Sequence, residues 1–281
     1  MLSSLQQYRR LLRIEQWYKN LVIFLPLLFA DSLLLQPPLK IFWGFLGFCC
    51  ISSASYILND WRDRKEDALH PTKKTRPLAS GKISGTAACT VVLLLSTIVL
   101  AVALQLGIFY SSVLAIYAVF TTLYSFGLKH IPILDIAMIA FNFVLRMSAG
   151  FLEFPPYETI FYFLALFALI VVFGTYKRRS DIKLVGEKAA QHKPVLRFYT
   201  KCNAYTLRII SILGLGWSLV MLVQLHALGI TTALVFSIFL GFSLYLFSQK
   251  PHLVIKPHYL LRIWYWDLLV LLCIGIVFMT S

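Results

Sequence analysis

The feature that most constrains this chain is a series of long apolar segments separated by short polar ones. The hydrocarbon core of a bilayer is about 30 Å thick, so a helix needs roughly 20 apolar residues to cross it. Measured against that length, the sequence predicts nine membrane spans. They lie at about 21–35, 41–58, 86–105, 109–126, 133–150, 159–176, 205–226, 231–247 and 261–280.

The composition argues against an ordinary soluble protein. Of the 281 residues, 59% are hydrophobic and 14% are charged, whereas about 25% are charged in a typical soluble domain. Backbone polar groups in lipid must be paired within the protein, which leaves helices and closed barrels, and the apolar runs are too long for barrel strands. We therefore expect an all-α, polytopic membrane helical bundle that forms a single domain over residues 1–281.

The distribution of charge predicts how the chain is oriented. The net charge is +14, and Lys and Arg gather in the N-terminal segment, in 59–85 and in 177–204, whereas Lys40 is the one basic residue on the opposite side. This is the positive-inside pattern, which predicts a cytoplasmic N-terminus in the inner (plasma) membrane. A nucleic-acid partner is not expected, because no basic stripe falls on a soluble module.

Four oxygen-bearing side chains follow the second apolar run at regular spacing. Asn59, Asp63 and Asp67 are four residues apart, and Asp60 lies three residues before Asp63. If the helix continues through them, all four share one face. Carboxylates packed so closely repel one another unless a cation lies between them, and oxygen ligands suit Mg²⁺. The pattern predicts a Mg²⁺ site with the ligands Asn59, Asp60, Asp63 and Asp67.

A basic loop comes directly after these acids. Lys73, Lys74 and Arg76 lie among turn residues in the segment 70–81. Acids that hold a metal beside bases that bind phosphate oxygens indicate a site for a Mg²⁺–diphosphate complex. Two simpler interpretations stay open. The acids can be a solvated helix end neutralised by its own basic neighbours, and the loop can carry ordinary positive-inside charge.

The motifs resemble a known family. The pattern Asn59-Asp60-x-x-Asp63-x-x-x-Asp67, followed by Arg76-Pro77-Leu78-x-x-Gly81, is similar to the first aspartate-rich motif of the UbiA-type prenyltransferase superfamily. Within it, the chain resembles the decaprenyl-phosphate phosphoribosyltransferases up to about residue 205. Three stretches carry that likeness: Gln16-Trp17-Tyr18-Lys19-Asn20, His70-Pro71-Thr72-Lys73 with Arg76-Pro77, and Tyr124-Ser125-x-x-Leu128-Lys129-x-x-Pro132-x-Leu134-Asp135.

The resemblance implies a reaction. A 5-phosphoribosyl group would pass from phosphoribosyl diphosphate to a polyprenyl (decaprenyl-type) phosphate, with Mg²⁺ as cofactor and diphosphate as product. The catalytic acids would be Asp60, Asp63 and Asp67. The resemblance and the charge pattern together suggest further substrate-binding residues, namely Lys19, Asn20, Lys73, Lys74, Arg76, Tyr124 and Lys129.

The sequence departs from the usual pattern of the superfamily after the sixth span. Prenyl-diphosphate users usually carry a second aspartate cluster there, whereas this chain has a basic run with one acid, Asp181. A run of this kind fits an acceptor that is already a monophosphate, bound by Lys177, Arg178 or Arg179. Simple positive-inside charge is the alternative interpretation.

One charge lies inside a predicted span. Arg146 falls within 133–150, where a charge must face the bundle interior and a partner. It is expected either to bind substrate or to form an ion pair with another span.

Two other functions remain open. A prenyl diphosphate can be the donor to an aromatic or other acceptor on the same fold. A lipid or ion transporter is disfavoured, because it would place ionisable residues near the bilayer midplane.

Overall fold

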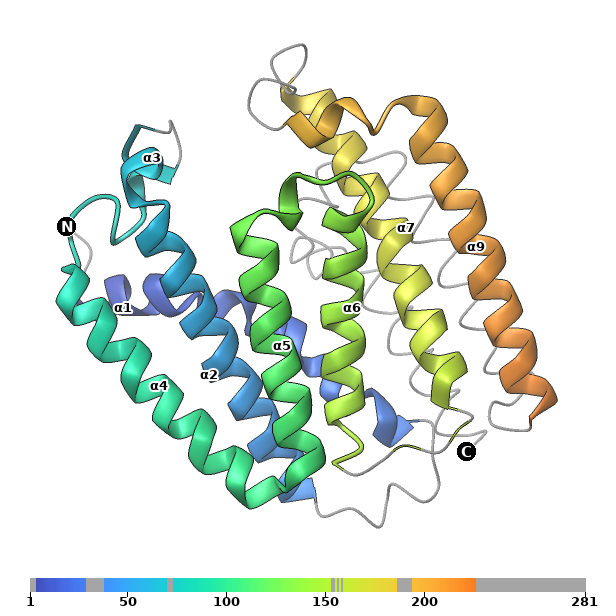
Figure 1. Ribbon diagram of the computed structural model, residues 1–281, viewed down its shortest axis with the longest axis horizontal. Helices are drawn as coiled ribbons and strands as arrows, with labels where there is room; N and C mark the ends of the chain where they lie inside the picture. Colours follow the sequence, from blue (N-terminus) through green and yellow to red (C-terminus); the bar gives the residue numbers. More distant parts are fainter. Residues whose placement is uncertain are drawn as a thin grey trace, which may run out of the picture. The chain divides into compact units, whose positions relative to one another are not determined.

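The computed structural model describes residues 4–28, 38–69, 73–152, 155, 157, 159–185 and 194–225, and every regular element among them is helical (Figure 1). Five helices in this part of the chain are long and apolar enough to cross a membrane. The all-α, multi-pass character is therefore confirmed. These helices are α2 (Pro38–Arg62), α4 (Gly85–Leu106), α5 (Ile108–Phe126), α7 (Thr159–Val185) and α9 (Lys201–Gln224).

The other predicted spans have different outcomes. The span 133–150 corresponds to the shorter helix α6 (Leu134–Ala149). Residues 21–28 belong to η1 (Ile14–Leu28), a 3₁₀ helix rather than an α-helix, and it contains Pro26. Proline has no backbone N–H, so Pro26 interrupts the hydrogen-bond series of the helix. The spans 231–247 and 261–280 lie outside the described residues, so the number of spans and their orientation stay predictions.

The described residues group into two compact units. The first contains the residues up to Phe126 together with Leu145–Pro155, and the second contains Gly127–Val144 and the described residues beyond 156. Helix α6 contributes to both units. The expectation of a single domain stays a prediction.

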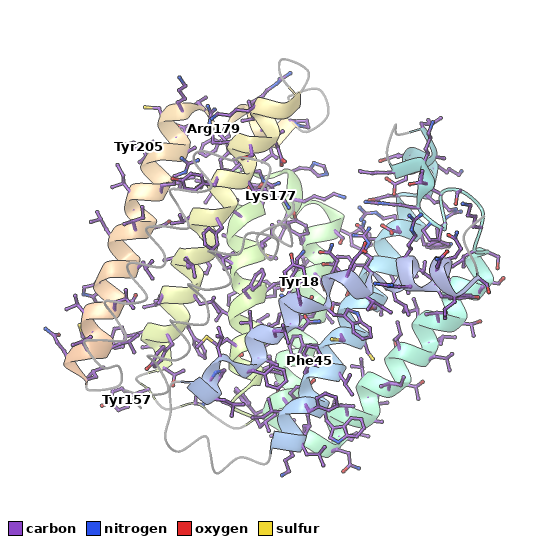
Figure 2. All side chains as sticks on the ribbon, turned by 180° about the vertical axis from the view of Figure 1, so that it is seen from behind. Tyr18, Phe45, Tyr157, Lys177, Arg179 and Tyr205 are labelled. Carbon is purple, nitrogen blue, oxygen red and sulfur yellow. The ribbon has the colours of Figure 1, made fainter. Side chains whose placement is uncertain are left out.

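The first unit is organised around α2, which packs against α1 (Ser4–Leu12), η1, α4 and α5. Figure 2 labels Tyr18 of η1 and Phe45 of α2. The rings of Phe24 and Phe45 join these two elements, with centroids 5.6 Å apart. A Cβ added at Gly150 would collide with the carbonyl oxygen of Ile23, so glycine is what allows the end of α6 to approach η1.

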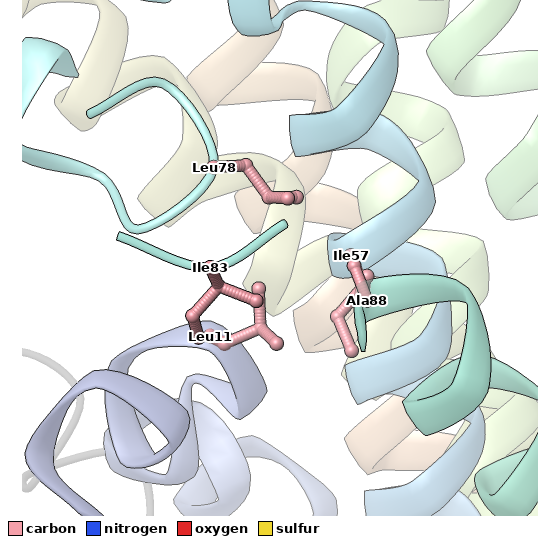
Figure 3. Close-up of a cluster of buried hydrophobic side chains, with 5 residues drawn as sticks. All are labelled: Leu11, Ile57, Leu78, Ile83 and Ala88. Atoms are coloured by element: carbon pink, nitrogen blue, oxygen red, sulfur yellow. The ribbon is translucent and has the colours of Figure 1, made fainter. Parts of the chain in front are cut away.

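A buried apolar cluster fixes the loop that carries the predicted phosphate-binding bases. Leu78 and Ile83 of that loop pack with residues of α1, α2 and α4 (Figure 3). Burial of such side chains contributes about 1.5–3 kcal/mol each. The loop is therefore anchored beside the end of α2. The members of the cluster are Leu11, Ile57, Leu78, Ile83 and Ala88.

The second unit is built on α7 and α9, which lie side by side (Figure 1). A Cβ at Gly174 of α7 would lie 2.6 Å from Cγ2 of Ile136, so this glycine lets α6 and α7 approach closely. Lys177, Arg179 and Tyr205 lie at one end of the α7–α9 pair (Figure 2). The basic run predicted from the sequence is thus gathered at that end.

Candidate metal and diphosphate site

The acidic motif lies where α2 gives way to the short helix α3 (Arg64–Leu69). Helical hydrogen bonds continue across the junction. Asp63 N donates to Asn59 O at 2.9 Å, and Asp67 N donates to Asp63 O at 2.8 Å. The expected helical spacing of the motif is therefore kept.

Two of the aspartates converge on one cation. Asp60 and Asp67 are 4% and 2% exposed. Nη1 of Arg76 lies 3.0 Å from Oδ1 of Asp60 and 2.6 Å from Oδ2 of Asp67. Lys73 Nζ lies 3.5 Å from the other oxygen of Asp67. Buried carboxylates need this compensation, because an unpaired charge is costly away from water.

A second arginine reaches the same site from the N-terminal segment. Arg13 Nη2 donates to Asp60 Oδ1 at 2.6 Å, and its guanidinium lies 4.6 Å from the ring centroid of Tyr56. Arg13 has a φ of 50°, which is unusual for a residue with a side chain. It stands between α1 and η1, so the turn there directs its guanidinium to Asp60.

The other two members of the motif form a separate pair. Asn59 Nδ2 donates to Asp63 Oδ2 at 3.2 Å, and Arg62 Nε donates to Asp63 Oδ1 at 3.1 Å. In the described part of the chain, no three His, Cys, Asp or Glu side chains are grouped closely enough to hold a metal ion. The four-ligand Mg²⁺ site stays a prediction.

The side chains nevertheless fit a hard divalent cation. All the candidate ligands offer oxygen, and two carboxylates already point at a single positively charged nitrogen. Mg²⁺ is usually held by one or two carboxylates together with substrate phosphates. Asp60 and Asp67 therefore suit a metal that arrives with a phosphate ligand.

The basic loop has the turn chemistry that its motif requires. Ser80 N donates to Arg76 O at 2.9 Å, and Ile83 N donates to Pro77 O at 3.2 Å. Gly81 has a φ of 69°, in the left-handed region that favours glycine. Lys73 and Lys74 lie in the exposed 3₁₀ turn η3 (Lys73–Thr75).

Arg146 is buried within the first unit. It is 5% exposed. Its Nε donates to Asn20 Oδ1 and its Nη2 donates to Tyr117 OH, both at 2.7 Å. Asn20 in turn donates to Ser52 Oγ at 3.3 Å. This network links η1, α2, α5 and α6. It brings together Asn20, which was predicted to bind substrate, and Arg146, which was predicted either to bind substrate or to form an ion pair.

Lys19 lies next to this network. Burial, and after it the nearby positive charges of Arg146 and Arg13, together lower the pKa of Lys19 to about 8. Lys19, Arg13 and Arg146 thus form a region of concentrated positive charge, which favours an anion.

This shift predicts a pH dependence. Below pH 8 Lys19 is protonated, and above pH 8 it becomes neutral. If it binds a substrate phosphate, KM should rise between pH 7.5 and 9.5 by up to about tenfold per unit. Lys19→Arg, which stays charged, should flatten this rise. A KM that rises equally in both proteins would assign the titration to another group.

In the second unit, Arg178 is engaged by acids. It is 5% exposed, and its Nε lies 2.8 Å from Oδ2 of Asp135, which is fully buried. The hydroxyl of Tyr199 donates to the other oxygen of Asp135. Burial, and then the hydrogen bond to Asp135, raise the pKa of Tyr199, which keeps the hydroxyl protonated as a donor. Arg178 Nη1 also lies 3.7 Å from Asp181.

The remaining predicted residues lie in both units. Lys177 is exposed on α7, Lys129 is partly exposed in η4 (Leu128–His130), and Tyr124 is partly exposed on α5. Sequence reasoning missed the contacts of Arg13, Tyr117 and Tyr199. It also missed that Asp135 is the partner of Arg178, although a lone acid at the start of an apolar helix signals such a pair.

Comparison with known proteins decides the family. Residues 20–266 match the model of the UbiA prenyltransferase family. The chain belongs to that family. This membership confirms the resemblance that the aspartate motif predicted.

Two relatives illustrate its place in the family. The decaprenyl-phosphate phosphoribosyltransferase of Corynebacterium glutamicum is 34% identical over 199 residues, which are 67% of this chain and 58% of that protein. The uncharacterized protein y4nM of Sinorhizobium fredii is 41% identical over 145 residues, or 50% of this chain and 27% of that one. The chain thus spans between about a quarter and three fifths of the lengths of these relatives.

A solved structure supports the fold. A UbiA homolog from Archaeoglobus fulgidus, bound to GPP and Mg²⁺, superposes with a TM-score of 0.72 at 20% identity, covering 97% of this chain and 98% of that one. At this identity the likeness defines a UbiA-like membrane fold.

Proposed function

We propose that this UbiA-family membrane transferase moves the 5-phosphoribosyl group of phosphoribosyl diphosphate to a polyprenyl phosphate and releases diphosphate. The observation that carries the proposal is the pair of buried carboxylates, Asp60 and Asp67, which meet at one cation beside a basic loop. The sugar donor is favoured by the likeness to the decaprenyl-phosphate phosphoribosyltransferases. It is favoured also by the basic run at the end of α7, which contains the single acid Asp181.

The acids would hold the donor through a metal. Asp60 and Asp67, with Asp63 and Asn59 beside them, would bind Mg²⁺. When bound, Mg²⁺ would draw negative charge from the departing diphosphate. Lys73, Lys74 and Arg76 would bind the diphosphate oxygens directly and stabilise the charge that develops as the bond to the sugar breaks. The buried position of the two aspartates strengthens these electrostatic effects.

The acceptor needs little activation. A lipid phosphate is already an anion at neutral pH, so its oxygen can attack the sugar without a general base. Within the first unit, Lys19, Asn20 and Arg146 are proposed to bind substrate phosphate. Within the second, the exposed Lys177 and the partly exposed Lys129 are proposed for the same chemistry. Arg178 and Asp181 are proposed to position the basic run 177–179. Tyr124 is proposed as a further substrate contact.

The positive-inside pattern leads us to propose that the site faces the cytoplasm. Accessibility labelling can test this orientation. A cysteine introduced at Lys74 should react with a membrane-impermeant maleimide in inverted vesicles but not in intact cells. The opposite labelling pattern would reverse the orientation.

The reaction itself is tested with the purified protein in lipid. Radiolabelled phosphoribosyl diphosphate and polyprenyl phosphate should yield a labelled lipid that depends on Mg²⁺ and is lost with EDTA. Consumption of a labelled prenyl diphosphate with an aromatic acceptor, and no label transferred from the sugar donor, would replace this proposal with prenyl transfer.

A further inference from the structure

The buried acids of the metal site are already neutralised by the protein's own cations. Arg76 bridges Asp60 and Asp67, Arg13 binds the same oxygen of Asp60 that Arg76 contacts, and Lys73 approaches Asp67. A divalent ion that binds to these oxygens must first displace the guanidinium groups. The free ion therefore competes with an internal counterion.

Displacement of Arg76 has a cost that a diphosphate can offset. The Arg76 side chain is 27% exposed, so much of it is shielded from water. A guanidinium that loses two carboxylates in such a place is left poorly compensated. Phosphate oxygens are good replacements, because guanidinium binds them through paired, charge-assisted hydrogen bonds. A metal that carries a diphosphate supplies both partners at once.

Arg13 adds to this effect from a different element. Its contact with the Tyr56 ring and its turn between α1 and η1 hold it near Asp60. Arg76 belongs to a loop that the apolar cluster of Leu78 and Ile83 anchors. Both cations are thus kept at the acids by the fold, and a change in their partners is a change of side-chain contacts only.

We propose that Arg76, assisted by Arg13, makes this site specific for a metal–diphosphate complex over the free metal ion. The inference rests on the proposed function in one respect, namely that a diphosphate donor binds at these acids. Arg76 blocks Asp60 and Asp67 when diphosphate is absent and transfers to the diphosphate oxygens when the complex binds. Metal and diphosphate then strengthen each other's binding reciprocally.

The coupling is measured with Mn²⁺ as a spectroscopic substitute for Mg²⁺. Electron paramagnetic resonance of the purified protein gives Mn²⁺ affinity without and with saturating methylene diphosphonate, corrected for the complex formed in solution. In the wild type we expect the analogue to tighten Mn²⁺ binding by at least about tenfold. In Arg76→Gln, free Mn²⁺ should bind about fivefold or more tightly than in the wild type, and the analogue should lose most of its effect.

Two further variants keep the test informative. Arg64→Gln is the matched control, since Arg64 donates to the carbonyl of Trp61 at 2.9 Å. It should keep the wild-type affinities. Arg76→Lys retains the positive charge, so it should keep the competition with Mn²⁺. It is the variant to measure if Arg76→Gln does not fold.

Each outcome is decisive. If Arg76→Gln weakens free Mn²⁺ binding or leaves it unchanged, Arg76 does not compete for the site, and the inference is wrong. Strong free Mn²⁺ binding to the wild type, unaffected by the analogue, also overturns it. The analogue carries neither sugar nor prenyl group, so coupling without phosphoribosyl transfer would refute the proposed donor and leave this inference standing.

Discussion

Replacement of Asp67 by asparagine is expected to lower the rate of phosphoribosyl transfer by about two to three orders of magnitude. Asparagine keeps the shape of the side chain and an oxygen that can accept from Arg76, which lies 2.6 Å from Asp67. It removes the negative charge that a metal requires. The loss should therefore appear in kcat and in Mg²⁺ dependence. The melting temperature should fall less than in a variant of a fully buried pair, because Arg76 is 27% exposed and keeps Asp60 as a partner.

Glu66→Gln is the matched control for this prediction. Glu66 is the neighbouring acid and is exposed, so its removal should leave the rate within about twofold, as for most surface substitutions. The two variants are compared by transfer of radiolabel to lipid and by thermal unfolding in detergent. An Asp67→Asn enzyme that keeps more than about a tenth of the wild-type rate would contradict the assigned role.

The largest effect on stability is expected at Asp135. In Asp135→Asn, the buried guanidinium of Arg178 loses the carboxylate 2.8 Å away and keeps only the more distant contact with Asp181. Removal of one member of a buried pair costs about 3–5 kcal/mol. Asp135 is fully buried and Arg178 is 5% exposed, so solvent screens the pair weakly. Asp135 also accepts a hydrogen bond from the hydroxyl of Tyr199, which connects the segment before α9 to the start of α6.

Asp181→Asn serves as the comparison for Asp135. Its carboxylate lies 3.7 Å from Arg178 Nη1 and its side chain is 23% exposed, so its loss should cost less than about 1 kcal/mol. Unfolding in detergent measures both variants. Replacing Asp135 and Arg178 together by apolar residues should recover part of the loss. Equal destabilisation by the two single variants would show that the buried pair is not the source.

Helix positions were largely predictable because they depend on local hydrophobicity. The run predicted at 86–105 forms α4 (Gly85–Leu106), and the run at 109–126 forms α5 (Ile108–Phe126). The first predicted span, 21–35, was less predictable, because apolar composition does not distinguish a 3₁₀ helix from an α-helix. Pro26 and close packing against Gly150 accompany a 3₁₀ helix there.

The site was only partly predictable for a related reason. Helical spacing places Asp60 and Asp67 on a common face, so their shared orientation follows from the sequence, although α2 and α3 are separate helices. Arg13 reaches Asp60 across 47 positions of the chain, and no local rule pairs them. Arg178 was expected to bind phosphate, yet it lies on Asp135, 43 positions away.

The sequence by itself determined the membrane class, the apolar helices, the aspartate motif and the family, because each depends on the composition or spacing of neighbouring residues. Only the tertiary structure decided which partner each buried charge receives. Burial forces every charge to find a partner, and the packing of distant helices chooses it. As a result, Arg76 and Arg13 donate hydrogen bonds to Asp60, Arg146 donates to Asn20, and Arg178 donates to Asp135.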